Sequence, residues 1–121
     1  MSFEVIEHVQ DGRAFLDECK RVIKSDGYII VSTPNKYIYR AVAHIADGGP
    51  DPTHINEMTY RKFKKLFSSY FRIVYSNYTL PLFPRLADRL GNERLFSASE
   101  SLAGMLRFAS LNVMLVGTAY E

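Results

Sequence analysis

Residues 28–35 read Tyr-Ile-Ile-Val-Ser-Thr-Pro-Asn, and this segment indicates the fold class more strongly than any other in the chain. Its first six residues are apolar, aromatic or β-branched almost without interruption, which is typical of a strand buried on both faces. Pro34 is expected to end the strand because proline has no N–H group to donate to a sheet. Such a strand predicts a parallel sheet covered by helices on both faces.

A helix is expected immediately before this strand, over residues 11–24. Apolar side chains recur there at helical spacing, Asp11 is suited to cap the N-terminus, and Gly27 is expected to end the helix. The only cysteine, Cys19, falls on the apolar stripe and is interpreted as a small core residue. A helix followed directly by a buried strand is typical of α/β proteins.

The rest of the chain extends this α/β pattern. Residues 35–58 are expected to form mainly a long loop, with one or two helical turns between Ile38 and Ile45. Thr59 is expected to cap a helix that buries Phe63 and Phe67. The order is completed by a strand at 72–80, two helical pieces within 84–108 and a strand at 111–119. No repeat or internal boundary is visible, so one domain is expected.

Composition and charge exclude several classes of protein. The 121 residues are 47% hydrophobic, which is enough for one core, and the net charge of +2 gives no electrostatic case for nucleic acid or an anionic membrane. One cysteine excludes an intrachain disulfide and a multi-cysteine zinc site, and it fits a reducing compartment. The most apolar stretch, Leu111–Val116, is far shorter than the ~20 residues of a spanning helix. We therefore expect a soluble cytoplasmic protein.

Three spaced blocks of sequence resemble class I S-adenosylmethionine-dependent methyltransferases. The first block is EVIEHVQD at residues 4–11, followed by FL at 15–16, RVIK at 21–24 and DG at 26–27. The second is STPN at residues 32–35. The third, DPTHINEMT at residues 51–59, is similar to the family's N-P-x-H-x-x-E-x-T loop. The resemblance spans residues 1 to about 80 and points to methyltransferases that carry an E-x-x-E-H motif.

This resemblance implies the C-terminal half of a Rossmann-like α/β sheet: the end of the family's strand 4, strands 5 and 6, and an antiparallel strand 7, with flanking helices. It divides the chain into a family-matching core at 1–80, a variable helical insertion at 81–109 and a last strand at 110–121. The family holds its cofactor mainly through a glycine-rich turn upstream of strand 4, and no G-x-G-x-G occurs in these 121 residues. Residues 1–121 alone are therefore expected to bind S-adenosylmethionine weakly.

The E-x-x-E-H motif is a candidate metal site. Glu4, Glu7 and His8 are spaced so that one helical turn would place all three side chains on one side, and His54 comes from the third block. Carboxylates and imidazoles without thiolates suit Mg²⁺ or Mn²⁺. The resemblance to small-RNA 3′-terminal 2′-O-methyltransferases implies Glu4, Glu7, His8 and His54 as ligands. The alternative is that Glu4 and His8 only line the turn, as in family members without metal.

Other roles are assigned to the same residues and to Asn35. His54, with His8, is a candidate catalytic residue, because an imidazole with an ordinary pKa of about 6.5 can accept a proton near neutrality. The alternative for His54 is a loop histidine bonded to the backbone. Glu4 is a candidate cofactor-binding residue. Asn35 follows the buried strand at the edge where α/β sheets bind ligands, so it is expected either to contact substrate or to bond into the turn after Pro34.

These residues lead to one functional hypothesis with two alternatives. The expected function is S-adenosylmethionine-dependent methyl transfer to an oxygen of a small-molecule or sugar acceptor. One alternative is a non-catalytic α/β interaction module, and the other keeps the enzyme but has the terminal ribose of a small RNA as acceptor. The strand that corresponds to the family's strand 4 would be an exposed edge, which predicts dimerisation through that edge.

Overall fold

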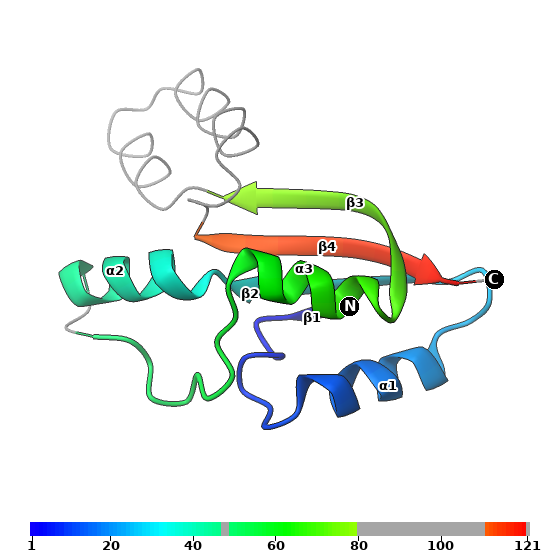
Figure 1. Ribbon diagram of the computed structural model, residues 1–121, viewed down its shortest axis with the longest axis horizontal. Coiled ribbons are helices and arrows are strands. Elements are labelled where there is room, and N and C mark those ends of the chain that lie inside the picture. Colours follow the sequence, from blue (N-terminus) through cyan, green and yellow to red (C-terminus); the bar gives the residue numbers. More distant parts are fainter. Residues whose placement is uncertain (47–48, 80–110, 121) are drawn as a thin grey trace, which may run out of the picture.

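The computed structural model describes residues 1–46, 49–79 and 111–120, which form a twisted four-stranded sheet and three helices (Figure 1). The strands lie in the order β1-β2-β4-β3. The elements in chain order are β1 (Ser2–Phe3), α1 (Gly12–Val22), β2 (Tyr28–Pro34), α2 (Lys36–Ala46), α3 (Tyr60–Ser68), β3 (Phe71–Thr79) and β4 (Asn112–Ala119). The expected α/β fold class is confirmed.

The last strand, β4, lies between β2 and β3 and is antiparallel to both. Its register with β2 runs from Tyr28 opposite Thr118 to Pro34 opposite Asn112. β1 pairs with β2 in the parallel direction. The predicted antiparallel direction of the last strand is confirmed, whereas its position inside the sheet was not predicted, because no local pattern in the sequence specifies which strands are neighbours.

The buried strand and the helix before it form as predicted. β2 ends at Pro34, and the last four residues of the strand are buried. Asp11 caps α1 by accepting hydrogen bonds at Oδ1 from the N–H groups of Arg13 at 2.8 Å and Ala14 at 3.3 Å. The helix ends at Val22, because Ile23 already has extended backbone angles, and Gly27 lies in a later turn. Gly27 therefore does not end the helix itself.

One hydrophobic core joins α1 and α3 to the same face of the sheet. The two phenylalanines predicted to face inward on α3, Phe63 and Phe67, are fully buried, and Thr59 caps the helix by accepting from the Lys62 N–H at 3.3 Å. Burial of such side chains is the main stabilising contribution to a domain of this size. The principal core residues on the helices and the central strands are Leu16, Ile29, Val31, Phe63, Phe67, Val113 and Leu115.

The region after β2 is more helical than predicted. Residues 35–58 were expected to be mainly loop, but α2 extends over 11 residues, about three turns. Its aromatic and β-branched residues have modest helix propensity, which concealed the helix. The helix begins with Tyr39 N–H donating to the Asn35 carbonyl at 2.8 Å, and Ala43 on its inner side is only 2% exposed. The loop that leads to α3 is correspondingly shorter.

The strand expected at 72–80 is β3. The two helical pieces predicted within 84–108, and the insertion predicted at 81–109, lie outside the described residues.

Among the helices in the described ranges, none combines the length and apolar character needed to cross a membrane.

Candidate functional site

The parallel pairing of β1 and β2 brings the loops that follow them to the same edge of the sheet. Glu4, the first residue after β1, has a φ of 52°, in the left-handed region that non-glycine residues seldom adopt. Its N–H donates to the Ser32 carbonyl at 3.3 Å, and its Oε1 accepts from Ser32 Oγ at 2.7 Å. Glu4 is thereby held against the end of β2.

Three of the four predicted metal ligands converge. Ligand atoms of Glu7, His8 and His54 all lie within 4.8 Å of one another, and the two imidazole rings meet edge to face with centroids 4.6 Å apart. Glu4 is outside this group, because its left-handed backbone directs its carboxylate to Ser32. The structure thus brings together one carboxylate and two imidazoles, those of Glu7, His8 and His54, which we call the trio. Metal binding by these residues, catalysis by the two histidines and cofactor binding by Glu4 are still predictions.

Glu7 is a fully buried carboxyl group. Its Oε2 accepts a hydrogen bond from Thr33 Oγ1 at 3.1 Å, whereas its Oε1 is buried without a hydrogen-bond partner among the described residues. Burial raises the pKa of Glu7 above the ordinary 4.5, and the neighbouring charge of Glu4 adds to this shift. A buried carboxylate oxygen without a partner is costly, so it identifies a position at which a cation or a proton would be stabilised.

His54 is held on a tight turn that begins at Asp51. The Asp51 Oδ1 accepts hydrogen bonds from the Thr53 N–H at 2.8 Å and the Thr53 hydroxyl at 2.7 Å, which hold the pKa of Asp51 below its usual value. The His54 N–H donates to the Asp51 carbonyl at 3.2 Å. The His54 Nδ1 is buried without a hydrogen-bond partner in the described part of the chain. Both His54 and Glu7 therefore contribute an unsatisfied buried atom to the trio.

The tautomer of His8 follows from its contact with this turn. His8 Nδ1 lies 3.1 Å from the Thr53 carbonyl oxygen. A carbonyl oxygen only accepts hydrogen bonds, so Nδ1 carries a proton, and the neutral imidazole then has its lone pair on Nε2. A histidine whose Nδ1–H is fixed by a carbonyl is the usual arrangement for metal ligation through Nε2.

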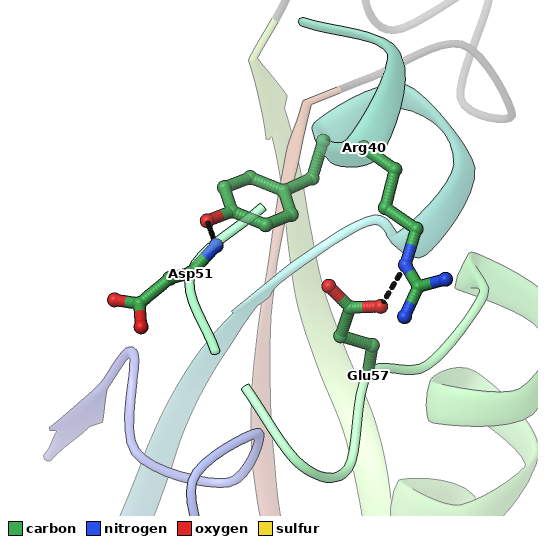
Figure 2. A network of polar contacts seen from close by, with 4 residues as sticks. Arg40, Asp51 and Glu57 are labelled. Atoms are coloured by element: carbon green, nitrogen blue, oxygen red, sulfur yellow. Dashed lines mark hydrogen bonds and ion pairs between the residues drawn. The ribbon is translucent and has the colours of Figure 1, made fainter. Parts of the chain in front are cut away.

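A network on α2 holds the loop that carries His54 (Figure 2). The Asp51 N–H donates to the Tyr39 hydroxyl at 3.0 Å, and the Tyr39 ring lies 4.8 Å from the His54 ring. Arg40 Nε donates to Glu57 Oε2, and the Glu57 side chain is only 4% exposed. Figure 2 shows the Arg40 and Glu57 side chains facing each other between α2 and the loop.

This network was not identified as part of the site from the sequence. Tyr39 falls in the segment that was predicted to be mainly loop, and Glu57 is only one letter of the N-P-x-H-x-x-E-x-T pattern. Arg40 gave no signal at all, because its partner lies 17 positions away. The aromatic residues shortly before the histidine loop, Tyr37 and Tyr39, are no denser there than in the chain as a whole, so no local signal marked this network.

Asn35, the predicted substrate residue, is 3% exposed. Its N–H donates to the Leu111 carbonyl at 2.6 Å, and its backbone forms an isolated parallel bridge with Met58. Asn35 therefore joins the end of β2 to the start of β4 and to the segment before α3. Contact between its side chain and substrate remains a prediction.

Two hollows lie near these loops. A cavity of about 200 Å³ lies at the end of the sheet, and the described residues that line it are all uncharged, namely Phe3, Ser32, Asn77, Asn112, Val113 and Met114. A larger one of about 410 Å³ lies between the start of α1 and α3, and its lining includes the cationic side chains of Arg13, Lys62 and Lys65. Of these two hollows, the smaller is the one that borders Ser32, the hydrogen-bond partner of Glu4.

Comparison with known proteins identifies relatives of part of the chain. A probable S-adenosylmethionine-dependent methyltransferase of Mycobacterium tuberculosis is 44% identical over 39 residues, which are 32% of this chain and 14% of that protein. A probable S-adenosylmethionine-dependent methyltransferase of Mycolicibacterium smegmatis is 32% identical over 69 residues, 57% of this chain and 26% of that protein. The matched segment thus spans about a quarter or less of each relative.

A solved structure shares the fold. The YcgJ protein of Bacillus subtilis superposes with a TM-score of 0.50 at 15% sequence identity, covering 99% of this chain and 63% of that one. Residues 1–70 match the family described as a methyltransferase domain. Because this match covers more than half of the chain, the chain belongs to the methyltransferase domain family, whose class I members have this α/β fold.

Proposed function

We propose that the chain is the acceptor-side half of an S-adenosylmethionine-dependent methyltransferase that methylates an oxygen of a small-molecule or sugar acceptor. The observation that carries the proposal is the convergence of Glu7, His8 and His54 at the ligand-binding edge of the sheet, with Glu7 Oε1 and His54 Nδ1 buried and without hydrogen-bond partners among the described residues. Two unsatisfied buried polar atoms in one cluster are typical of a functional site.

The trio fits a divalent cation. One carboxylate and two imidazoles form a donor set for a borderline or hard ion such as Mn²⁺ or Mg²⁺, and the unpartnered atoms of Glu7 and His54 are the ones that a cation would satisfy. We propose Glu7, His8 and His54 as ligands, with Glu4 beside the cofactor and bonded to Ser32. A bound ion would orient the acceptor hydroxyl and lower its pKa.

His54 supports a second mechanism that needs no metal. Methyl transfer to oxygen forms a carbon–oxygen bond as the carbon–sulfur bond of the sulfonium breaks, and the acceptor hydroxyl must lose its proton. In the tautomer that carries its proton on Nε2, the His54 Nδ1, which has no hydrogen-bond partner among the described residues, would accept that proton. In this mechanism His54 is the general base, Tyr39 packs beside its ring, and Glu7 stabilises the positive charge that His54 gains.

The uncharged cavity supports the choice of acceptor. Asn77 and Asn112 contribute amide groups, and Phe3 and Met114 contribute apolar surface, which together suit a neutral hydroxylated compound. Among the described residues, no Lys or Arg lines this cavity, which supports a neutral acceptor over a phosphate-bearing one such as the terminal ribose of a small RNA. Incubation with labelled S-adenosylmethionine and matched neutral and phosphorylated acceptors tests this preference.

The donor is proposed to be held largely by residues outside this chain. No G-x-G-x-G occurs in the 121 residues, and the YcgJ protein contains a further part that this chain does not cover. Calorimetric titration with S-adenosylmethionine tests this division, because tight binding by residues 1–121 alone would contradict it.

The alternative function, an interaction module, would use the edge of the sheet. β1 has two residues and, among the described strands, pairs with β2 alone, and Met1 and Phe3 are 90% and 52% exposed. We propose that a second copy pairs with this edge. Sedimentation of the wild type against Phe3→Glu tests the dimer, since a monomeric wild type would contradict the proposal.

Manganese titration tests the metal centre most directly. The wild type is expected to bind one Mn²⁺, Glu7→Gln to lose it, and Glu4→Gln to retain most of the affinity because Glu4 lies outside the trio. Indistinguishable titrations for the wild type and Glu7→Gln would contradict metal binding by the trio and would leave His54 as a general base.

A further inference from the structure

Helix α2 holds the histidine loop on both sides of His54. The Tyr39 hydroxyl accepts from the Asp51 N–H three positions before His54, and Arg40 binds Glu57 three positions after it. Tyr39 and Arg40 are consecutive, so their side chains leave the helix about 100° apart and reach different ends of the loop. Neither contact belongs to the trio itself.

Tyr39 makes two different contacts with the loop. Its hydroxyl lies 3.0 Å from the Asp51 nitrogen, while its ring packs against the His54 imidazole with centroids 4.8 Å apart and planes tilted by 37°. The His8 ring lies against His54 as well, at 4.6 Å and a plane angle of 76°. The imidazole of His54 is therefore enclosed by one ring from α2 and one from the loop after β1.

We propose that Tyr39 is a positioning residue for His54. Its hydroxyl fixes the turn from which His54 projects, and its ring prevents the imidazole from rotating away from Glu7 and His8. The proposal rests on the proposed function of the trio. A ligand or base held in one orientation before binding loses less conformational entropy when it acts, which is why supporting residues affect affinity without contacting the ion or substrate.

Three variants separate the roles of the ring and the hydroxyl. Tyr39→Phe retains the ring and removes the hydroxyl, whereas Tyr39→Leu removes both. Tyr37→Leu is the matched control, because Tyr37 is on the same helix but is 69% exposed. Far-UV circular dichroism and urea unfolding confirm that each variant is folded.

Three measurements are made on the full 121-residue chain. In the metal-free state, nuclear magnetic resonance follows the ring signals of His54 and the hydrogen exchange of the Asp51 amide. Tyr39→Phe should leave the His54 signals nearly unchanged and accelerate Asp51 exchange roughly 5- to 10-fold, as expected for loss of one hydrogen bond. Tyr39→Leu should shift the His54 signals and weaken Mn²⁺ binding about 10-fold or more. Tyr37→Leu should change none of the three.

The possible outcomes are distinguishable. If Tyr39→Leu is folded and its His54 signals match those of Tyr37→Leu, the positioning role is wrong. If Tyr39→Leu does not fold, unchanged Asp51 exchange in Tyr39→Phe overturns the proposal on its own. If the wild type binds no Mn²⁺, the metal chemistry fails, whereas the two measurements on the metal-free chain still decide the role of Tyr39.

Discussion

Thr33 Oγ1 donates a hydrogen bond to Glu7 Oε2 at 3.1 Å, and this contact joins the end of β2 to the loop after β1 inside the protein core. Thr33 is 1% exposed and Glu7 is fully buried. The second carboxylate oxygen of Glu7 has no hydrogen-bond partner among the described residues. One oxygen is therefore held in place while the other remains available to a cation or a proton, as expected for a preorganised ligand.

The first prediction concerns the cost of this buried carboxylate. Burial raises the pKa of Glu7 in the folded protein above 4.5, so the folded protein binds this proton more tightly than the unfolded chain does. The protonated carboxyl group therefore makes its full contribution to the free energy of unfolding below pH 4.5, and this contribution is lost as the pH rises through the folded pKa. Without metal, Glu7→Gln should therefore be more stable than the wild type at pH 7 and nearly equal at pH 4. Urea unfolding in the presence of a chelator measures both differences.

Glu4→Gln is the control for this experiment, because Glu4 is exposed and bonded to Ser32. Its gain at pH 7 should be smaller than that of Glu7→Gln, because it removes only the repulsion between the two carboxylates and leaves the buried charge of Glu7 in place. A Glu7→Gln protein that is less stable than the wild type at pH 7 would show that the charged carboxylate is stabilised by its surroundings.

The second prediction concerns Thr33. Thr33→Val keeps the shape of the side chain but removes the donor, which leaves both oxygens of Glu7 unsatisfied. A loss of about 1–3 kcal/mol in the free energy of unfolding is expected, as for a buried group that loses its partner. Thr33→Ser retains the hydroxyl and should lose less. Equal losses in the two variants would mean that packing rather than the hydrogen bond dominates.

Local signals in the sequence were sufficient for most of the fold. Asp11 caps N–H groups two and three residues later, and Thr59 caps α3 in the same way, so both helix starts are encoded within one turn. Strand β2 was equally clear because its apolar run ends at a proline. The position of β4 between β2 and β3 depends on pairing between segments far apart in the chain, for which one sequence has no pattern.

The candidate site was predictable in its residue types but not in its geometry. Spacing placed Glu4 with Glu7 and His8 on the assumption of a helical turn. The turn forms at Val5–His8, while Glu4 adopts a φ of 52° that points its carboxylate elsewhere. The contact between Glu7 and Thr33 joins residues 26 positions apart, so no local periodicity could reveal it.

The third prediction uses the ion pair between Arg40 and Glu57. The carboxylate of Glu57 is 4% exposed while Arg40 is 50% exposed, so removing Arg40 leaves a buried charge without its partner. Arg40→Met should therefore destabilise the chain by about 1–3 kcal/mol, less than a fully buried pair would lose, because solvent screens Arg40. Adding Glu57→Gln should restore part of the loss. Chemical denaturation of the double-mutant cycle measures the coupling.

The exposed pair Arg21–Glu18 is the comparison for this cycle. Both side chains are about two-thirds exposed, and Arg21→Met should change stability by less than about 0.5 kcal/mol. If Arg40→Met costs no more than Arg21→Met, burial of Glu57 contributes nothing to the strength of its ion pair.

The fourth prediction concerns the close approach of α3 to β4 at Gly117. A Cβ atom at this position would lie 2.7 Å from Phe67 Cε1 and 2.8 Å from Phe71 Cβ. The Phe67 ring can shift, but the Cβ of Phe71 moves only with the backbone of β3. Gly117→Ala should therefore cost about 1–3 kcal/mol in the free energy of unfolding through overpacking.

The Phe67→Leu background tests which neighbour causes this cost, because the ring contact is absent there. The same Gly117→Ala substitution should then cost at least about 0.5 kcal/mol less, measured by urea unfolding of all four proteins. Equal costs in both backgrounds would place the whole effect at Phe71.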